Sequence, residues 1–298
     1  MSVYTQISQN KLKTFLIMAI FVFLFSGFFY LVGIYFDSPN AYLVLGLIIS
    51  IFSSFGSYYW SDRIVLWTAG AVPADKRKYF DLYTSVENLS IASGLPMPKI
   101  YVIDDPAPNA FATGRDPKHA IICATTGLLN LLDRSDIEGV ISHELSHIKN
   151  YDILLSSIVA VLVGTLALLS DWMMRGFFWR GRGRDDNENR NPAFTVLFIL
   201  TLILTPLVAT LIQLAISRKR EFLADASGVL ITRNPEGLAS ALEKISGYPY
   251  PMKNTSSSIA HLYIGNPLKK SKSSPSWIAA LFSTHPPAAE RIKILRSL

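Results

Sequence analysis

The 298-residue chain contains a single cysteine, Cys123, and is poor in charged residues, which make up only 17% of the sequence. One cysteine excludes a scaffold stabilised by disulfide bonds. The absence of any G-X-Y or heptad repeat excludes collagen-like and coiled-coil architectures. Half of the residues are hydrophobic, which excludes a disordered chain. This composition is typical of a membrane protein that also carries a soluble part.

The chain has a small surplus of basic residues, with 28 Lys and Arg against 22 Asp and Glu, for a formal net charge of +6. Membrane proteins gather cations on their cytoplasmic side, so the surplus requires no nucleic-acid partner. We therefore expect a lipid bilayer and no nucleic acid among the partners of this chain.

Two uncharged runs near the N-terminus, 14–36 and 41–60, are separated by a short turn that contains a proline. As a helix, the first run rises about 34 Å, which is enough to cross a hydrocarbon core of about 30 Å. Lys11 and Lys13 precede the first run and Arg63 follows the second. We therefore predict a transmembrane hairpin with both ends in the cytoplasm.

Two later apolar runs, 153–169 and 193–216, flank the polar loop 170–192. If both runs cross the membrane, the five arginines of this loop lie outside, against the positive-inside rule. Two interpretations stay open, namely a pair of spanning helices, which we favour, and a shallow hairpin. The predicted division is an N-terminal hairpin at 1–60, soluble segments at 61–152 and 217–298, and a second membrane hairpin at 153–216.

The soluble segments show the pattern of a small sheet beside helices, which predicts an α+β domain. The helix that ends this part of the chain is expected to begin with Ser135 as its N-cap and Glu138 as the capping-box partner. The expected strands are Lys99–Ile103, Ala110–Thr113 and Ala120–Ala124, and the expected helices are Lys76–Ala92, Thr125–Leu131 and Ser135–Asn150.

The last of these helices carries His143, Glu144 and His147 in the spacing H-E-x-x-H. Positions i and i+4 share one face of a helix, so both imidazoles can reach one metal ion. Glu144 can then contact a water on that ion without being a ligand, which is the arrangement of zinc peptidases. The alternative is a helix with two hydrogen-bonded histidines and a surface glutamate. Because Glu144 falls within an apolar stripe, where a carboxylate needs a partner, we favour the metal site.

A catalytic zinc site needs a third protein ligand, and Glu221 is the candidate. Asp225 lies one helical turn further, on the same face, and can accept a hydrogen bond from the free N–H of a ligand histidine. The alternative is that Glu221 only pairs with the neighbouring arginines at the membrane edge. Beside H-E-x-x-H we favour the ligand role.

The spacing to the membrane runs predicts where this site lies. Ile153 begins the third run six residues after His147, about 9 Å along a helix that we expect to continue. Glu221 follows Ile216, the end of the fourth run, by only five residues. Both halves of the site are therefore expected at the same membrane face, which the flanking charges predict to be the cytoplasmic one.

These residues resemble the HtpX-type integral-membrane zinc metalloendopeptidases, relatives of the CAAX prenyl proteases. The resemblance covers nearly the whole chain. It implies a membrane α-helical protein with a zincin-like α+β catalytic domain and up to four transmembrane helices. It also implies a gluzincin site with one Zn²⁺ per chain on His143, His147 and Glu221, and Glu144 as base. The matching segments are the first hairpin, Pro106–Gly114, His143–Asp152 (HELSHIKNYD), Ser217–Asp225 (SRKREFLAD) and Ser283–Ile292 (STHPPAAERI).

The resemblance suggests roles for two further places. Asn109, Ala110, Phe111 and Ala112 match a strand that lies along the cleft of such peptidases and can pair with an extended substrate backbone. The alternative is an ordinary sheet edge. His285 matches a residue near the metal that steadies the oxyanion, and the alternative is that its His-Pro-Pro turn only caps the last helix.

The resulting hypothesis is a zinc-dependent endopeptidase that cleaves membrane or membrane-associated proteins, including misfolded ones, in quality control and the stress response. The implied location is a bacterial inner membrane, with the catalytic domain facing the cytoplasm. The alternatives are a CAAX-type prenyl protease and a non-catalytic membrane scaffold with a zinc site. Manganese or cobalt could occupy the same ligands, although zinc is the default for two histidines and a glutamate.

Overall fold

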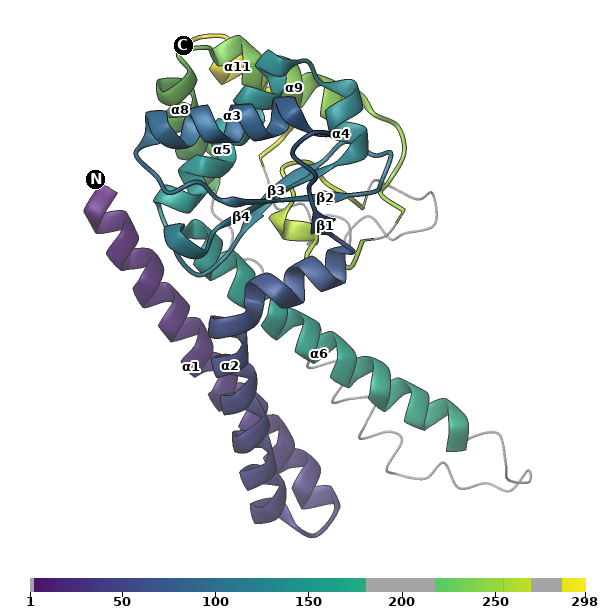
Figure 1. The fold of residues 1–298 in the computed structure, drawn as a ribbon. Helices are drawn as coiled ribbons and strands as arrows, with labels where there is room; N and C mark the ends of the chain where they lie inside the picture. The colour runs from purple at the N-terminus through teal and green to yellow at the C-terminus, as the bar shows by residue number, and fades with distance from the viewer. Residues whose placement is uncertain (1–2, 181–217, 254, 269–285) are drawn as a thin grey trace.

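The computed structural model describes residues 3–180, 218–253, 255–268 and 286–298. In this part of the chain, three helices are long and apolar enough to cross a membrane: α1 (Val3–Tyr35), α2 (Pro39–Ala69) and α6 (Asp152–Arg180). Figure 1 shows α1 and α2 as an antiparallel hairpin that projects from an α/β body, with α6 leaving the same end of that body. The turn between α1 and α2 lies at the far end of the hairpin, away from the body.

The first two predicted runs lie within α1 and α2, and 153–169 lies within α6, so each falls in a helix long and apolar enough to cross a membrane. The fourth run, 193–216, lies outside the described residues, as does most of the polar loop before it. The second helix does not stop at Trp60 but continues to Ala69. Its last turns are part of the body, because Val65 and Ala69 pack in one cluster with Phe111 of the sheet.

The membrane helices pack through the apolar face of α1. Ile17, Phe21, Phe25 and Phe28 recur at helical spacing, are buried, and pack with apolar residues of α6. Other large apolar residues of α1, such as Phe23, are exposed on the opposite side. A helix that is apolar all round and buried on one side only is suited to lie between protein and lipid.

The body contains a four-stranded sheet in the order β1-β2-β4-β3. β2 and β4 are parallel, while β1 pairs with β2 and β3 pairs with β4 in antiparallel fashion. The three strands that the sequence predicts are confirmed, and the two-residue β1 was not predicted. The order places β3 at an edge of the sheet, and the strands are β1 (Val72–Pro73), β2 (Lys99–Ile103), β3 (Ala110–Thr113) and β4 (Ile121–Thr125).

Helices from both soluble segments form one hydrophobic core with the sheet. Close helix packing in this core depends on Gly139, because a Cβ at this position would lie 2.5 Å from the backbone nitrogen of Leu238. The described helices of the body are α3 (Phe80–Ser93), α4 (Thr126–Leu131), α5 (Arg134–Lys149), α8 (Arg218–Thr232), α9 (Pro235–Gly247) and α11 (Ala288–Leu295), with 3-10 turns at Pro117–His119 and Ala260–Leu262. The predicted combination of membrane helices and an α+β domain is confirmed.

Two predicted helix starts are wrong. α3 begins at Phe80 rather than Lys76, since the residues before it form turns around the Asp75 carboxylate. The N-cap of α5 is Asp133, not Ser135. The Asp133 side chain accepts a hydrogen bond from the backbone N–H of Asp136, and the Asp136 carboxylate accepts from the Asp133 N–H, which makes a capping box two residues earlier than predicted.

This cap gives a first prediction. Replacing Asp133 by Ala should destabilise the protein by about 1 kcal/mol, because it leaves the first N–H groups of α5 without their side-chain acceptor. Ser135→Ala removes only an exposed hydrogen bond from Asn234 and should cost less than half as much. Thermal melts of the two detergent-solubilised variants measure the difference. Equal melting temperatures for Asp133→Ala and Ser135→Ala would show that Asp133 is not the stabilising N-cap of α5.

Candidate metal centre

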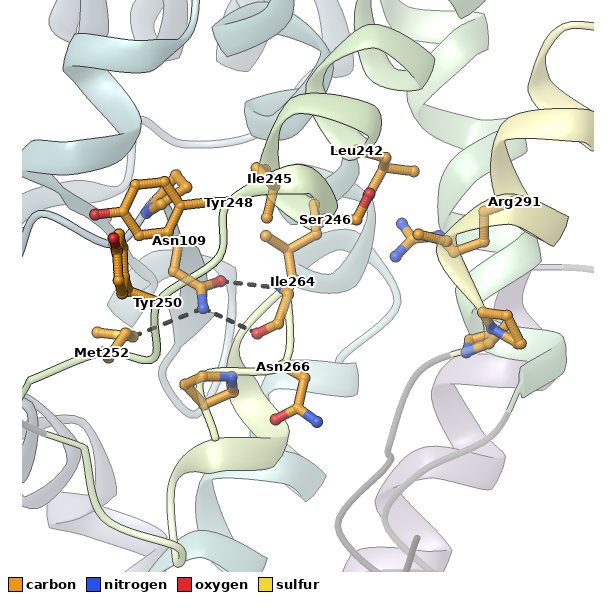
Figure 2. A pocket seen from close by; sticks show the side chains of 17 residues that line it. Asn109, Leu242, Ile245, Ser246, Tyr248, Tyr250, Met252, Ile264, Asn266 and Arg291 are labelled. Atoms are coloured by element: carbon orange, nitrogen blue, oxygen red, sulfur yellow. Dashed lines mark hydrogen bonds between the residues drawn. The ribbon is translucent and has the colours of Figure 1, made fainter. Parts of the chain in front are cut away.

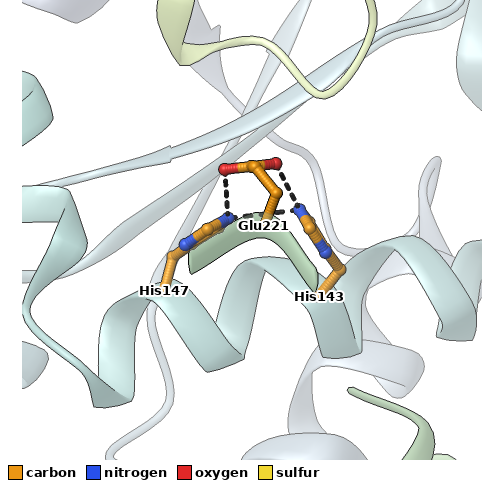
Figure 3. A group of neighbouring side chains, drawn as sticks. All are labelled: His143, His147 and Glu221. Carbon is orange, nitrogen blue, oxygen red and sulfur yellow. Dashed lines mark hydrogen bonds and ion pairs between the residues drawn. The ribbon is translucent and has the colours of Figure 1, made fainter. Parts of the chain in front are cut away.

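Three potential metal ligands converge between α5 and α8. His143 and His147 lie one turn apart on α5, and their Nε2 atoms are 3.2 Å from each other. Glu221 of α8 lies opposite, with its carboxylate oxygens 3.7 Å from His143 Nε2 and 3.6 Å from His147 Nε2. Figure 3 shows the two imidazoles rising from α5 toward this carboxylate. All three side chains are buried or nearly so, since the most exposed, His147, is only 14% accessible.

A close contact between the two helices produces this convergence. Gly228 of α8 faces α5, and a Cβ on it would lie 2.9 Å from the Ser142 hydroxyl and 3.1 Å from the His143 backbone nitrogen. A side chain at this position would require Ser142 or one of the two helices to shift. Glu221 and Asp225 lie two turns and one turn before Gly228 on the same helix, and so they meet the face of α5 that carries the histidines.

Each histidine is held on its second ring nitrogen by a buried aspartate. His143 Nδ1 lies 2.9 Å from the Asp225 carboxylate, and His147 Nδ1 lies 3.0 Å from the Asp152 carboxylate. An aspartate that accepts from Nδ1–H leaves Nε2 as the electron-pair donor, so both Nε2 atoms are directed into the space before Glu221. The contact of Asp225 with a ligand histidine is predictable from the sequence, whereas that of Asp152 was not predicted.

A break in the backbone brings Asp152 to His147. The predicted single helix from the histidines into the membrane is therefore wrong. α5 ends at Lys149, Tyr151 adopts a left-handed conformation with φ of 61°, and α6 begins at Asp152. The change of direction at Tyr151 places the Asp152 side chain against His147. In a continuous helix, position 152 would not lie on the same face as position 147.

A buried arginine completes the support of His143. Arg291 of α11 is 1% exposed and donates from Nε to one Asp225 oxygen at 2.8 Å and from Nη2 to the other at 2.6 Å. The same Nη2 lies 3.4 Å from His143 Nδ1. Arg291 falls within the STHPPAAERI segment, but the sequence analysis assigned it no role. Its position depends on α11 packing against α8 and α9.

The charges of this cluster favour a cation between the ligands. Burial lowers the pKa of His143 to about 4, aided by the charge of Arg291 and opposed by Asp225. Burial also disfavours a proton on His147, but the negative charge of Glu221 helps to overcome it and raises the His147 pKa to about 9. Burial disfavours the Asp225 anion, yet hydrogen bonds from His143 and Arg291 lower its pKa to about 2.

The three donors fit zinc in kind and in spacing. A tetrahedral ion with bonds of about 2.0–2.2 Å holds its ligand atoms roughly 3.3–3.6 Å apart. The separations among His143, His147 and Glu221 run from 3.2 to 3.7 Å. Two imidazole nitrogens at such a distance repel each other unless a proton or a metal cation lies between them, and a metal ion can take the place of that proton.

Glu144 follows His143 on α5 and is 3% exposed. It lies close enough for its negative charge to favour protonation of His147 and of Arg291, so it faces the same cluster. The apolar stripe that the sequence analysis placed around it is present, since Ile137, Val140 and Ile141 are buried. His285, the remaining catalytic prediction, lies outside the described residues.

The predicted substrate strand lies at the sheet edge, but part of it is already paired. The Asn109 side chain donates to the Gly265 carbonyl at 2.9 Å and accepts from the Gly265 N–H at 3.0 Å. The Ala110 carbonyl accepts from Ile264 N–H at 2.9 Å. Figure 2 shows the Asn109 amide with a dashed hydrogen bond to Met252. Both residues line a pocket of about 230 Å³. Asn109 and Ala110 therefore bind a segment of their own chain.

Ligands of this kind beside a buried glutamate, on a body joined to long apolar helices, define the class of membrane zinc metallopeptidases. A comparison with family models agrees, since the model described as Peptidase family M48 matches residues 77–298. The chain therefore belongs to peptidase family M48, whose members are zinc-dependent, and it is a membrane metalloendopeptidase.

Curated relatives match over the full length. The chain is 45% identical over 304 residues to a Protease HtpX homolog of Caldanaerobacter subterraneus subsp. tengcongensis, covering 100% of this chain and 98% of the relative. It is 44% identical over 296 residues to a Protease HtpX homolog of Tropheryma whipplei, covering 99% and 98%. Among solved structures, S. mikatae Ste24p matches with a TM-score of 0.49 and 19% identity, covering 98% of this chain and 66% of that one.

These findings confirm the predicted family, the enzyme class and the zinc dependence. They also favour an enzyme over the non-catalytic scaffold that the sequence analysis kept as an alternative. Membrane association and protein substrates follow from the same findings.

Proposed function

We propose that His143, His147 and Glu221 hold the zinc ion, and that Glu144 is the general base of peptide-bond hydrolysis. The observation that carries this proposal is the convergence of two Nε2 atoms and one carboxylate within 3.2 to 3.7 Å of each other, beside a buried Glu144. The substrates proposed are extended segments of membrane or membrane-associated proteins, including misfolded ones, and the cellular role is quality control under stress.

Glu144, Asp225 and Asp152 have different roles in the proposed reaction. Zinc, when bound, lowers the pKa of water towards about 7 and polarises a scissile carbonyl. Glu144 accepts a proton from the attacking water and returns it to the leaving amine, the ordinary cycle of general acid–base catalysis. Asp225 and Asp152 hold the two imidazoles in the tautomer and orientation that ligation needs.

One position of this sheet edge has no outward backbone hydrogen bond among the described residues, and it suggests where a substrate binds. The Asn109 carbonyl faces β4, where it accepts from the Thr125 N–H, so alternate residues of β3 face outward. Ala110 is outward and already pairs with Ile264, whereas the backbone of Phe111 lies opposite Cys123 within the sheet. Ala112 is the next outward residue. We propose that an extended substrate pairs with Ala112, rather than with the whole segment from Asn109.

We further propose that the body made by 61–152 and 217–298 faces the cytoplasm, with the enzyme in a bacterial inner membrane. Lys11 supports this, because its ammonium lies 4.4 Å from the Tyr151 ring, so the basic end of α1 is on the side of the body. Lys11, a charge that the positive-inside rule assigns to the cytoplasm, therefore lies on the same side of the membrane helices as the metal centre.

Labelling of introduced cysteines tests this orientation. The native Cys123 is fully buried, and burial raises the pKa of its thiol, so it should not react. Asp37→Cys, in the turn between α1 and α2, should react with a membrane-impermeant maleimide in intact spheroplasts. Lys76→Cys, exposed on the body, should react only after lysis. The opposite pattern would place the catalytic body outside.

Zinc-dependent proteolysis tests the function itself. Detergent-purified protein kept in chelator should cleave neither casein nor itself, and should do both after zinc is added. Glu221→Ala should not regain activity at the same zinc concentration, whereas Glu243→Ala, an exposed carboxylate of α9, should. A prenylated peptide should compete no better than its unprenylated form. Cleavage that persists in Glu221→Ala would exclude the proposed ligand, and strong preference for the prenylated peptide would favour a CAAX-type protease.

A further inference from the structure

Asn10 of the N-terminal membrane helix α1 reaches the metal centre. It is 4% exposed, and its amide nitrogen donates to Asp152 Oδ1 at 2.7 Å and to the Asn150 carbonyl at 3.0 Å. Its amide oxygen accepts from Arg220 Nη1 at 3.3 Å. The Asn10 amide thus uses both donor hydrogens and its acceptor oxygen to bind Asp152, Asn150 and Arg220, three residues next to the metal centre.

Each of these three residues lies next to a proposed metal ligand or to the helix that carries it. Asp152 accepts from Asn10 with one oxygen and from His147 Nδ1 with the other, so its orientation decides where the imidazole points. Asn150 is the residue that caps the end of α5, the helix of both histidine ligands. Arg220 immediately precedes Glu221 and lies 3.5 Å from the same Asp152 oxygen that Asn10 contacts.

The contact also lies at the most strained point of the connection. Tyr151, between Asn150 and Asp152, has a left-handed backbone that non-glycine residues adopt only when their surroundings hold it. Asn10 binds the residues on both sides of Tyr151, and the Lys11 ammonium lies over the Tyr151 ring. The N-terminal helix α1 therefore stabilises the left-handed turn at Tyr151, which places Asp152 against His147.

We propose that Asn10 is a positioning residue of the zinc site, acting on His147 through Asp152. The N-terminal helix is then an integral part of the metal centre and not only a membrane anchor. This inference rests on the proposed role of His147 as a zinc ligand. Asparagine suits the position because a carboxylate there would repel Asp152, and an aliphatic side chain would leave Asp152 Oδ1 without this donor in a buried place.

Zinc affinity of the full-length protein in detergent tests the proposal, measured by competition with a fluorescent chelator. Asn10→Ala should weaken zinc binding about tenfold, in the range typical of residues that orient metal ligands. Gln9→Ala is the matched control, since it removes an exposed amide from the neighbouring position. Asn10→Asp, which has nearly the same shape, should weaken binding at least as much and serves if the alanine variant does not fold.

A double-mutant comparison separates positioning from general stability. If Asn10 acts through Asp152, then Asn10→Ala should have no further effect on zinc affinity in an Asp152→Ala protein. Zinc affinity of Asn10→Ala equal to that of Gln9→Ala, or losses that multiply in the double variant, would overturn the inference. If the wild-type protein binds zinc and His147→Ala does not, the proposed zinc site holds even when the role of Asn10 is disproved. Wild-type protein without zinc binding would overturn both.

Discussion

Replacing Glu144 by glutamine should lower peptidase activity by about 10²–10⁴-fold, the usual contribution of a general base. Glutamine has nearly the same shape but cannot accept a proton from water. Because Glu144 is buried within the apolar stripe of α5, the substitution also removes a charge from a place where charge is costly, so the fold should not suffer. Zinc content should stay at one ion per chain.

The measurement is casein cleavage by the zinc-loaded variant, together with its metal content and melting temperature. Glu138→Gln is the matched control, because Glu138 lies on the same helix and only pairs with Arg134 at the surface. It should keep full activity. A folded, zinc-loaded Glu144→Gln protein with normal turnover would show that Glu144 is not the base.

Replacing Arg291 by methionine should destabilise the chelator-treated protein by about 3–5 kcal/mol. The substitution keeps much of the side-chain volume but leaves the Asp225 carboxylate, which is 2% exposed, without its two charged hydrogen bonds. Among the described residues, His143 then remains as the partner of Asp225. For a domain of this size the loss corresponds to a drop in melting temperature of roughly 10 °C. Zinc affinity should fall as well, because Asp225 orients His143.

Arg296→Met, at the C-cap of the same helix, is the control. Arg296 also makes carboxylate pairs, with Glu236 and Glu243, but its side chain is 43% exposed, so their loss should cost less than about 1 kcal/mol. The double variant Asp225→Asn with Arg291→Met removes both buried charges and should recover part of the stability. Equal melting temperatures for Arg291→Met and Arg296→Met would show that the buried pair contributes no more than a surface one.

Much of the fold was predictable because it depends on local pattern. The apolar runs were long enough to identify three membrane helices, and the strands of the body were found from short β-rich segments between turns. The errors occurred at boundaries. Ser135 and Asp133 are both good N-caps, and only the packed structure shows which of them the backbone of α5 uses. The end of α2 was missed because its last turns pack on the soluble core.

The substrate strand illustrates a different limit. The segment from Asn109 to Ala112 matched a motif, and the motif located an edge strand as expected. Its partner, however, is the segment at Ile264 and Gly265, about 150 residues later in the chain. Nothing in the local pattern indicates that these residues return to the sheet edge, so the sequence could not show that two of the four proposed positions are already paired.

By itself, the sequence determined the membrane character and the family of this protein, and it predicted the metal-binding helix, three ligands and a base. These depend on spacing along one helix and on the chemistry of imidazole and carboxylate groups. Only the tertiary structure decided what orients the ligands. Asp152 reaches His147 through a left-handed residue, while Arg291 and Asn10 act across 66 and 142 positions of the chain. A hydrogen bond requires placement within fractions of an ångström, and that placement comes from the packing of distant helices.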